Sequence, residues 1–401
     1  MEGALSAKRF DYPSGLGASN LKPFRMKRLI IFDVLRGIFL LMMIVDHSPS
    51  GLRLFTDQPI GFVTTAEGFV FVSAFLAGML FRRRTEKFGF AAARSATICR
   101  AWRIYRAHLL TLAFAFVIGS LFLAELPGVR NMLGQYLKNP GAAVFGSAIL
   151  LFRPPLMDIL PMYIWFSFLT PLAFLAAQRW GWRTVISASL AMWLISQTRV
   201  RDWLVTASQG IPYVEPGPFD MLAWQLLWVI GLFFGQRFQG GAAVIPMPKS
   251  LQRVLLALVI GFLGWRWGSI YLGVDLSHQM WWLDKWHLGP LRLMNFFATG
   301  WLISKFLKRL ECWETALRPL SLIGQHILPV FCCQICFSIL LIGMVEPLKD
   351  REPIASVLVI CQLLSAFLLG WLFECISRSK NSTAVRPNAF ATHPKVSTAE
   401  S

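Results

Sequence analysis

Charged side chains are scarce in this sequence: only 15% of its 401 residues are Asp, Glu, Lys or Arg. Soluble globular domains carry about 25%. Negatively charged residues are scarcer than positively charged ones, with 21 Asp and Glu against 39 Lys and Arg, so the formal net charge is +18. Together with a hydrophobic content of 55%, this composition excludes a soluble enzyme, a disordered chain and an ordinary nucleic-acid-binding protein.

Motifs for metal binding and redox chemistry are also lacking. The seven cysteines include one CxxC, at 333–336, and it lies in an apolar stretch. We therefore expect the cysteines to be buried and inert. Asp275, His278, Asp284 and His287 match no metal-ligand spacing, and no glycine-rich phosphate loop is present. The sequence thus predicts no metal site and no bound cofactor.

Long apolar runs are abundant instead. A membrane-spanning helix needs about 20 mostly apolar residues, which predicts an all-α fold: a polytopic transmembrane helical bundle with about ten spanning helices. The short stretch 141–152 can be spanning, re-entrant or interfacial. The ten expected spans are 29–47, 61–81, 104–125, 157–178, 184–197, 221–238, 251–272, 290–308, 319–345 and 355–376.

The distribution of basic residues decides between ten and eleven spans. If 141–152 does not span, most of the Lys and Arg fall on the side of the N-terminus. The positive-inside rule then favours ten helices with both termini cytoplasmic. This predicts a cytoplasmic tail over 1–28, a membrane domain over 29–376 and a disordered cytoplasmic tail over 377–401.

One basic run is especially dense, from Arg82 to Arg106. It can set the topology and contact anionic lipid. It can also attract a polyanionic cytosolic substrate such as a coenzyme A thioester. Both interpretations stay open at this point.

Ionisable residues at membrane depth indicate function, and the first expected helix holds several. Asp33 and Arg36 share a helix face and can pair. Arg36 and His47 are eleven residues apart, about 16 Å along a helix, and face the same direction. His47 can be a boundary histidine or a general base near the outer surface, a role that suits its ordinary pKa.

A second set of polar residues is expected near the outer side. Glu67 begins the second expected helix at the depth of His47, where it can orient the imidazole or complement the helix dipole. Arg266 and Arg292 can converge with Glu67 or extend to the membrane surface. His326 begins the ninth expected helix, where a capping or loop contact is the alternative to a functional role. Trp281 and Trp282 suit sugar stacking or an interfacial belt.

Five segments carry a resemblance to a known family. They are FDVLRGIFLLMMIVDH (32–47), GFVTTAEGFVFVSAFLAGMLF (61–81), FDMLAWQLLWVIGLFFG (219–235), DKWHLGPLRLMNFFA (284–298) and IGQHILPVF (323–331). On these, the chain resembles the OpgC family, membrane proteins associated with succinylation of osmoregulated periplasmic glucans. That family is related to acyltransferase family 3, whose Arg–ten residues–His spacing is similar to that of Arg36 and His47.

The resemblance implies an O-acyltransferase of the bacterial inner membrane. The donor would be a cytoplasmic acyl-CoA, namely succinyl-CoA, and the acceptor a hydroxyl of a periplasmic glycan. His47 would accept the hydroxyl proton, directly or while loading an acyl intermediate, and Arg36 would engage the donor. Glu67, Arg292 and His326 carry over as family-motif positions. The implied partners are membrane lipid and proteins of glucan synthesis, and no nucleic acid.

Two other functions compete with acyl transfer. A glycan or lipid transporter could use Arg36, His47 and Glu67 as a proton relay, but the sequence shows no inverted repeat and no pair of broken helices. An assembly subunit of a glucan-export or synthase complex would need no chemistry of its own.

Overall fold

The computed structural model describes residues 22–48, 50–211, 213–238, 247–274, 280–342 and 351–384, and the regular elements in these ranges are all helical. The expected tails 1–28 and 377–401 lie mostly outside the described residues. The helices are α1 (Lys22–Asp46), α2 (Thr65–Phe122), α3 (Pro127–Lys138), α4 (Pro140–Ala148), α5 (Ile159–Ser196), α6 (Val200–Ala207), α7 (Met221–Arg237), α8 (Lys249–Tyr271), α9 (Pro290–Leu310), α10 (Glu314–Gln325), α11 (Ile327–Ile342) and α13 (Glu352–Ala384), with short 3₁₀ turns η1 (Gly51–Phe55), η2 (Trp281–Leu283) and η3 (Glu311–Trp313).

Each of the ten apolar segments lies largely within helix. Two helices hold two segments each, because α2 is interrupted at Gly89 and α5 at Gly181. Both glycines have a φ near +80° (83° and 81°), a conformation that L side chains rarely adopt. At each glycine the helix divides into two arms.

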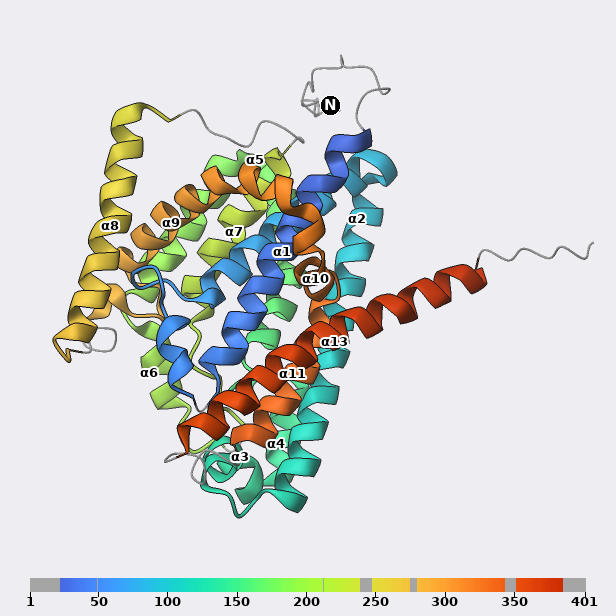
Figure 1. Cartoon of the computed structure of the whole chain (residues 1–401), viewed down its shortest axis with the longest axis vertical. Coiled ribbons are helices and arrows are strands. Elements are labelled where there is room, and N and C mark those ends of the chain that lie inside the picture. The colour runs from blue at the N-terminus through green and yellow to red at the C-terminus, as the bar shows by residue number, and fades with distance from the viewer. Residues whose placement is uncertain are drawn as a thin grey trace, which may run out of the picture.

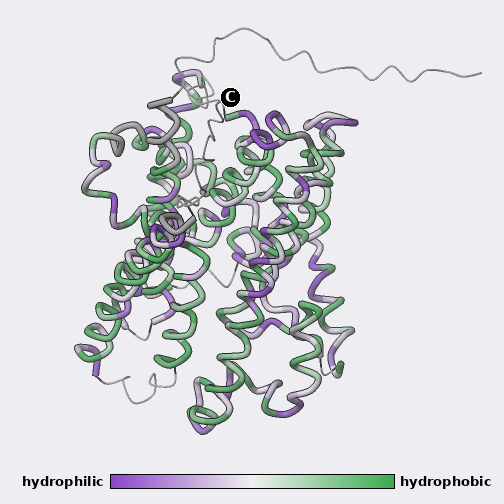
Figure 2. The backbone as a smooth tube through the Cα atoms, turned by 90° about the vertical axis from the view of Figure 1, so that its right-hand side faces the viewer, coloured by the Kyte–Doolittle hydropathy of each residue, from purple (hydrophilic) through white to green (hydrophobic). Residues whose placement is uncertain are grey.

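Among the described residues, four helices are long and apolar enough to cross a membrane: α2, α5, α8 and α13. A fifth crossing results if α10 and α11, bent by 77° at their junction, count as one span. Five of the ten expected crossings are thus not counted. Two are second arms of α2 and α5, and a third is α7, whose 17 residues fall short of the usual 20. The other two lie in α1 and α9, which contain charged residues such as Arg36 and Arg292. Figure 2 shows hydrophobic residues along most helices and hydrophilic residues gathered toward the ends.

The ambiguous stretch 141–152 forms the nine-residue helix α4 and the turn after it. Nine helical residues extend about 14 Å, less than half the hydrocarbon thickness of a bilayer. Figure 1 shows α4 beside α3 at one end of the bundle. The helix is therefore too short to span alone, as the charge distribution predicts.

The start of α1 and the end of α13 lie at the same end of the bundle. Near the close of α1, the Ser50 hydroxyl donates to the Glu352 carboxylate at the start of α13 (3.0 Å). Toward the other end, Asp33 of α1 is near His326, which hydrogen-bonds Glu374 late in α13. Helices α1 and α13 therefore run in opposite directions, so the start of α1 and the end of α13 share one end.

Small residues allow the central helices to pack at short range. A Cβ atom on Gly235 of α7 would lie 1.9 Å from the Phe75 carbonyl oxygen of α2, and one on Gly78 of α2 would lie 2.4 Å from the Leu232 carbonyl oxygen of α7. Close backbone approach through small residues is typical of helices packed in membranes.

The crossing of α1 over α10 depends on two further glycines. A Cβ atom on Gly324 would lie 1.8 Å from the Asp33 carbonyl oxygen, and one on Gly37 would lie 2.3 Å from the Leu320 carbonyl oxygen. This contact places Asp33 and Arg36 beside the junction of α10 and α11.

Replacing Gly324 with alanine is expected to lower the free energy of unfolding by about 3 kcal/mol, because the added methyl group collides with backbone rather than a flexible side chain. Thermal unfolding of the detergent-solubilised protein measures the effect. Gly261→Ala is the matched control, since nothing lies within 4 Å of its Cβ position. Equal stability of the two variants would contradict this account of the crossing.

Candidate functional site

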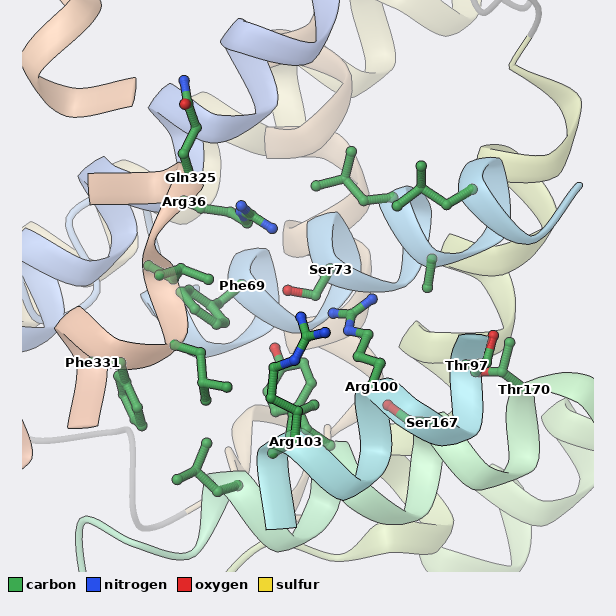
Figure 3. A pocket seen from close by; sticks show the side chains of 18 of the residues that line it. Arg36, Phe69, Ser73, Thr97, Arg100, Arg103, Ser167, Thr170, Gln325 and Phe331 are labelled. Carbon is green, nitrogen blue, oxygen red and sulfur yellow. The ribbon is translucent and has the colours of Figure 1, made fainter. Parts of the chain in front are cut away.

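A cavity of about 610 Å³ lies where α1, both arms of α2, α5 and the α10–α11 junction meet. Figure 3 shows Arg36 on one side and Arg100 and Arg103 on the other pointing into the same space, with Ser73 between them. Its wall has one carboxylate, Asp33, and a set of basic side chains: Arg36, Arg84, Arg100, Arg103 and His326. The cavity therefore favours an anionic ligand.

Arg36 is held in the wall by two groups. Its guanidinium donates to Asp33 (2.8 Å), so the pairing predicted from their i,i+3 spacing is confirmed. It also donates to the Gly324 carbonyl oxygen in the last turn of α10. Its Nε atom is buried and unpartnered within the described residues, so one donor stays available to a ligand.

Other polar atoms of the wall also lack a partner among the described residues. The Tyr163 and Ser167 hydroxyls are buried and line the cavity, and neither forms a hydrogen bond. A buried hydroxyl without a partner costs about 1–3 kcal/mol. Together with the Nε atom of Arg36, these groups form a polar set that a ligand with several acceptors would satisfy.

His326 lies at the junction of α10 and α11, where the two helices bend by 77°. Its Nε2 atom hydrogen-bonds Glu374 (3.2 Å), and Glu374 accepts a bond from Arg378 one turn later (2.7 Å). The expected span 319–345 is therefore divided between α10 and α11 by a bend that the sequence did not predict. Gly324 and Pro329 lie on either side of the bend, but neither residue type specifies an angle of 77° at His326.

A buried ion pair joins the starts of α2 and α9. Arg292, at the start of α9, donates to Glu67, at the start of α2, and both residues are inaccessible to solvent (0%). Glu67 also accepts from the Thr64 backbone N–H (3.1 Å) and hydroxyl, forming a capping box. Arg292 donates to the Leu283 carbonyl oxygen (3.3 Å), while its Nη2 atom is unpartnered among the described residues.

His47 directly follows the last residue of α1, and its side chain is exposed. The expected hydrogen bond from Glu67 to its imidazole is absent from the described contacts, because the Glu67 carboxylate is engaged by Arg292 and Thr64. The ammonium group that acts electrostatically on His47 belongs to Lys285. Burial and the positive charge of Arg292 lower the pKa of Lys285. Sequence reasoning did not identify this lysine.

A second pocket, of about 340 Å³, lies beside the ion pair. Of the residues expected to converge near the outer side, Arg292 lines this pocket, which we call the outer pocket; Trp281 also lines it. Trp282 is 37% exposed and its indole N–H contacts the Met280 sulfur (3.1 Å). Trp282 and Arg266 lie outside the lining. The lining residues are Gln58, Arg199, Arg201, Asp202, Pro218, Met280, Trp281, Asp284, Lys285, Trp286, His287 and Arg292.

Arg266 does not join Glu67 and Arg292. It lies on α8, half-buried, and its Nε atom has no partner among the described residues. The sequence set is therefore split: Glu67 and Arg292 meet, whereas His47 stands at the end of α1 and Arg266 on a peripheral helix.

An imidazole among carboxylates forms one wall of the outer pocket. His287 hydrogen-bonds Asp284 (2.7 Å) and Asp202 (3.2 Å) and lies 4.0 Å from Asp220. The bond to Asp284 raises the pKa of His287. Spacing could reveal only Asp284 and His287, because Asp202 and Asp220 are far away in sequence. Asp275 and His278, which precede Asp284 in the same stretch of sequence, lie outside the described residues.

Helix α1 connects the arginine-lined cavity to the exposed imidazole of His47. The arginine-lined cavity surrounds Arg36, and His47 follows eleven residues later, about 16 Å along the helix. One end can hold an anionic group, and the other presents an accessible imidazole beside a pocket with aromatic and charged walls. An acyl donor at the first and a hydroxyl acceptor at the second would fit this geometry.

Comparisons with known proteins agree with the resemblance found in the sequence. The family model described as OpgC protein matches residues 28–378. Searches of curated proteins and of solved structures return no match. The matched range runs from α1 to α13 and includes both the arginine-lined cavity and the outer pocket. The chain therefore belongs to the OpgC family.

Proposed function

We propose that the protein is a membrane O-acyltransferase that modifies a periplasmic glucan. It transfers an acyl group, proposed to be succinyl, from a cytoplasmic acyl-CoA to a glycan hydroxyl. The observation that carries this proposal is the 610 Å³ cavity with its basic wall of Arg36, Arg84, Arg100 and Arg103. Phosphate groups and carboxylates are the anions that arginine binds best, and coenzyme A carries several phosphates.

The proposed topology has ten spans with both termini cytoplasmic, in the inner membrane of a bacterium. The shared end of α1 and α13 and the short α4 support it. So does the basic run in the middle of α2, since Lys and Arg favour the cytoplasmic side. In this orientation the arginine-lined cavity opens toward the donor, and His47 lies toward the acceptor.

The proposed chemistry assigns each residue one task. His47 accepts the proton of the acceptor hydroxyl while its oxygen attacks the thioester carbonyl carbon. The carbon–oxygen bond forms, the carbon–sulfur bond breaks, and coenzyme A leaves as a thiolate that takes up a proton. Arg36 positions the donor, and the Glu67–Arg292 pair fixes the relative positions of α2 and α9 beside the acceptor.

Coenzyme A itself tests the donor site. The purified protein is expected to bind it, and Arg100→Gln is expected to weaken binding about tenfold, the effect of one lost charge-assisted hydrogen bond. Isothermal titration calorimetry measures both affinities. Arg94→Gln is the control, because Arg94 belongs to the same basic run but is exposed and outside the cavity lining. Equal binding by the wild type and both variants would contradict the proposed donor site.

A transporter remains the second candidate because α10 and α11 form a broken helix beside the cavity, an element typical of secondary transporters. The two functions differ in their products. Transport changes where a glycan is found, whereas acyl transfer changes its mass. Association with glucan-synthesis proteins is compatible with both.

A further inference from the structure

The outer pocket contains polar groups whose partners are missing in the described part of the chain. Arg292 is fully buried and lines the pocket, and its Nη2 atom forms no hydrogen bond with the described residues. The Gln58 side chain is 7% exposed, and its Oε1 atom is equally unpartnered. An unpaired donor and an unpaired acceptor, both desolvated, are costly unless a ligand satisfies them.

The pocket lining holds more cations than carboxylates: Arg199, Arg201, Lys285 and Arg292 against Asp202 and Asp284. Asp202 pairs with Arg199 and Arg201, and Asp284 pairs with His287. Lys285 has no carboxylate within ion-pair distance among the described residues. Its ammonium lies 4.9 Å from the centroid of the Trp286 ring.

More distant groups also act on Lys285. Its ammonium group is attracted by three carboxylates beyond ion-pair distance, those of Glu67, Asp57 and Asp46. The positive charge of Arg292 repels the same ammonium group. Because each nearby carboxylate already has a closer partner or lies too far away, Lys285 and the Nη2 atom of Arg292 are the cationic donors that stay available in the pocket.

We propose that this pocket binds the acceptor through an anionic substituent, a carboxylate or phosphate carried by a glycan, held between Lys285 and the Nη2 atom of Arg292. A glycan fits better than a free anion for two reasons. Trp281 and Trp286 line the pocket and offer aromatic faces to a sugar ring. The Gln58 amide oxygen can accept a bond from a sugar hydroxyl. The role as an acceptor site rests on the proposed function, but binding needs no acyl transfer.

The site predicts a preference for acidic over neutral glycans. The probes are a linear β-glucan hexasaccharide and the same chain oxidised to a uronic acid at one primary hydroxyl. Calorimetry on the detergent-solubilised full chain is expected to show at least tenfold tighter binding of the acidic probe. Lys285→Gln should abolish this difference without weakening the neutral probe, and Lys285→Arg should retain it.

Arg130→Gln is the matched control, since Arg130 is a basic residue of α3, paired with Glu125 and outside the pocket lining. Equal affinity of the wild type for both probes, or an unchanged preference in Lys285→Gln, would overturn the proposal. Competition by phosphatidylglycerol in the micelle, with none by phosphatidylcholine, would assign the site to a lipid headgroup and overturn the glycan. Retained preference in a protein that fails to transfer acyl groups would count against the proposed function alone.

Discussion

Replacing His47 with alanine is expected to reduce glycan acylation by about 10²–10⁴-fold, the usual contribution of a general base, while leaving the protein folded. The exposed imidazole directly follows the last residue of α1, so its removal opens no cavity in the core. The rate of acyl transfer by the purified protein measures the loss. Membrane insertion and glucan amount should be unchanged.

Two further variants distinguish a base from a structural histidine. His47→Gln preserves size and hydrogen bonding but cannot accept the proton, so it should be as inactive as His47→Ala. Added imidazole should restore part of the activity to His47→Ala and none to a variant that fails to fold. An active His47→Gln enzyme would refute the catalytic role. Normal acylation with reduced glucan export would favour the transporter.

The Glu67–Arg292 ion pair should show the largest effect on stability. Replacing Arg292 with methionine leaves the Glu67 carboxylate buried and uncompensated, because both residues have no solvent exposure. Breaking such a pair costs about 3–5 kcal/mol. Chemical unfolding in detergent measures the change.

A double variant separates the lost charge balance from lost packing. Glu67→Gln with Arg292→Met removes both charges but retains an amide oxygen that can accept the Thr64 N–H bond of the capping box. The double variant should therefore recover most of the stability lost in Arg292→Met. If it is as unstable as the single variant, packing rather than charge dominates at this position. A single variant within 1 kcal/mol of the wild type would show that the pair carries little energy.

Local patterns predicted the elements of the fold well. The ten apolar runs lie in helices, and i,i+3 spacing predicted the bond between Asp33 and Arg36. The size of α4 follows from its short apolar run. These features depend on residues close in sequence, where helical periodicity determines which side chains meet.

The arrangement of the helices relative to one another was harder to predict from the sequence. The bend at His326 depends on the contact between Gly324 and the Asp33 carbonyl and on the bond from His326 to Glu374, both of which join distant segments. The division of α2 and α5 into arms follows from single glycines with positive φ. A glycine within an apolar run does not reveal that conformation on its own.

The candidate site shows the same limit. The sequence left open whether Arg292 would meet Glu67, and it offered the imidazole of His47, not the arginine, as the direct partner of Glu67. The sequence did not identify Lys285 or Tyr163 as site residues. Their place in the site depends on their burial and on which hydrogen-bond or ion-pair partners they lack. Neither property can be inferred from residue type or spacing.

Mass spectrometry of periplasmic glycans tests acyl transfer most directly. Glycans are isolated from cells that contain the wild-type protein, the His47→Ala variant or no copy of the protein. The account predicts an added acyl mass on the glycans of wild-type cells only, with similar glycan amounts in all three strains. The mass would also identify the acyl group. Identical glycan masses in all three strains would contradict it.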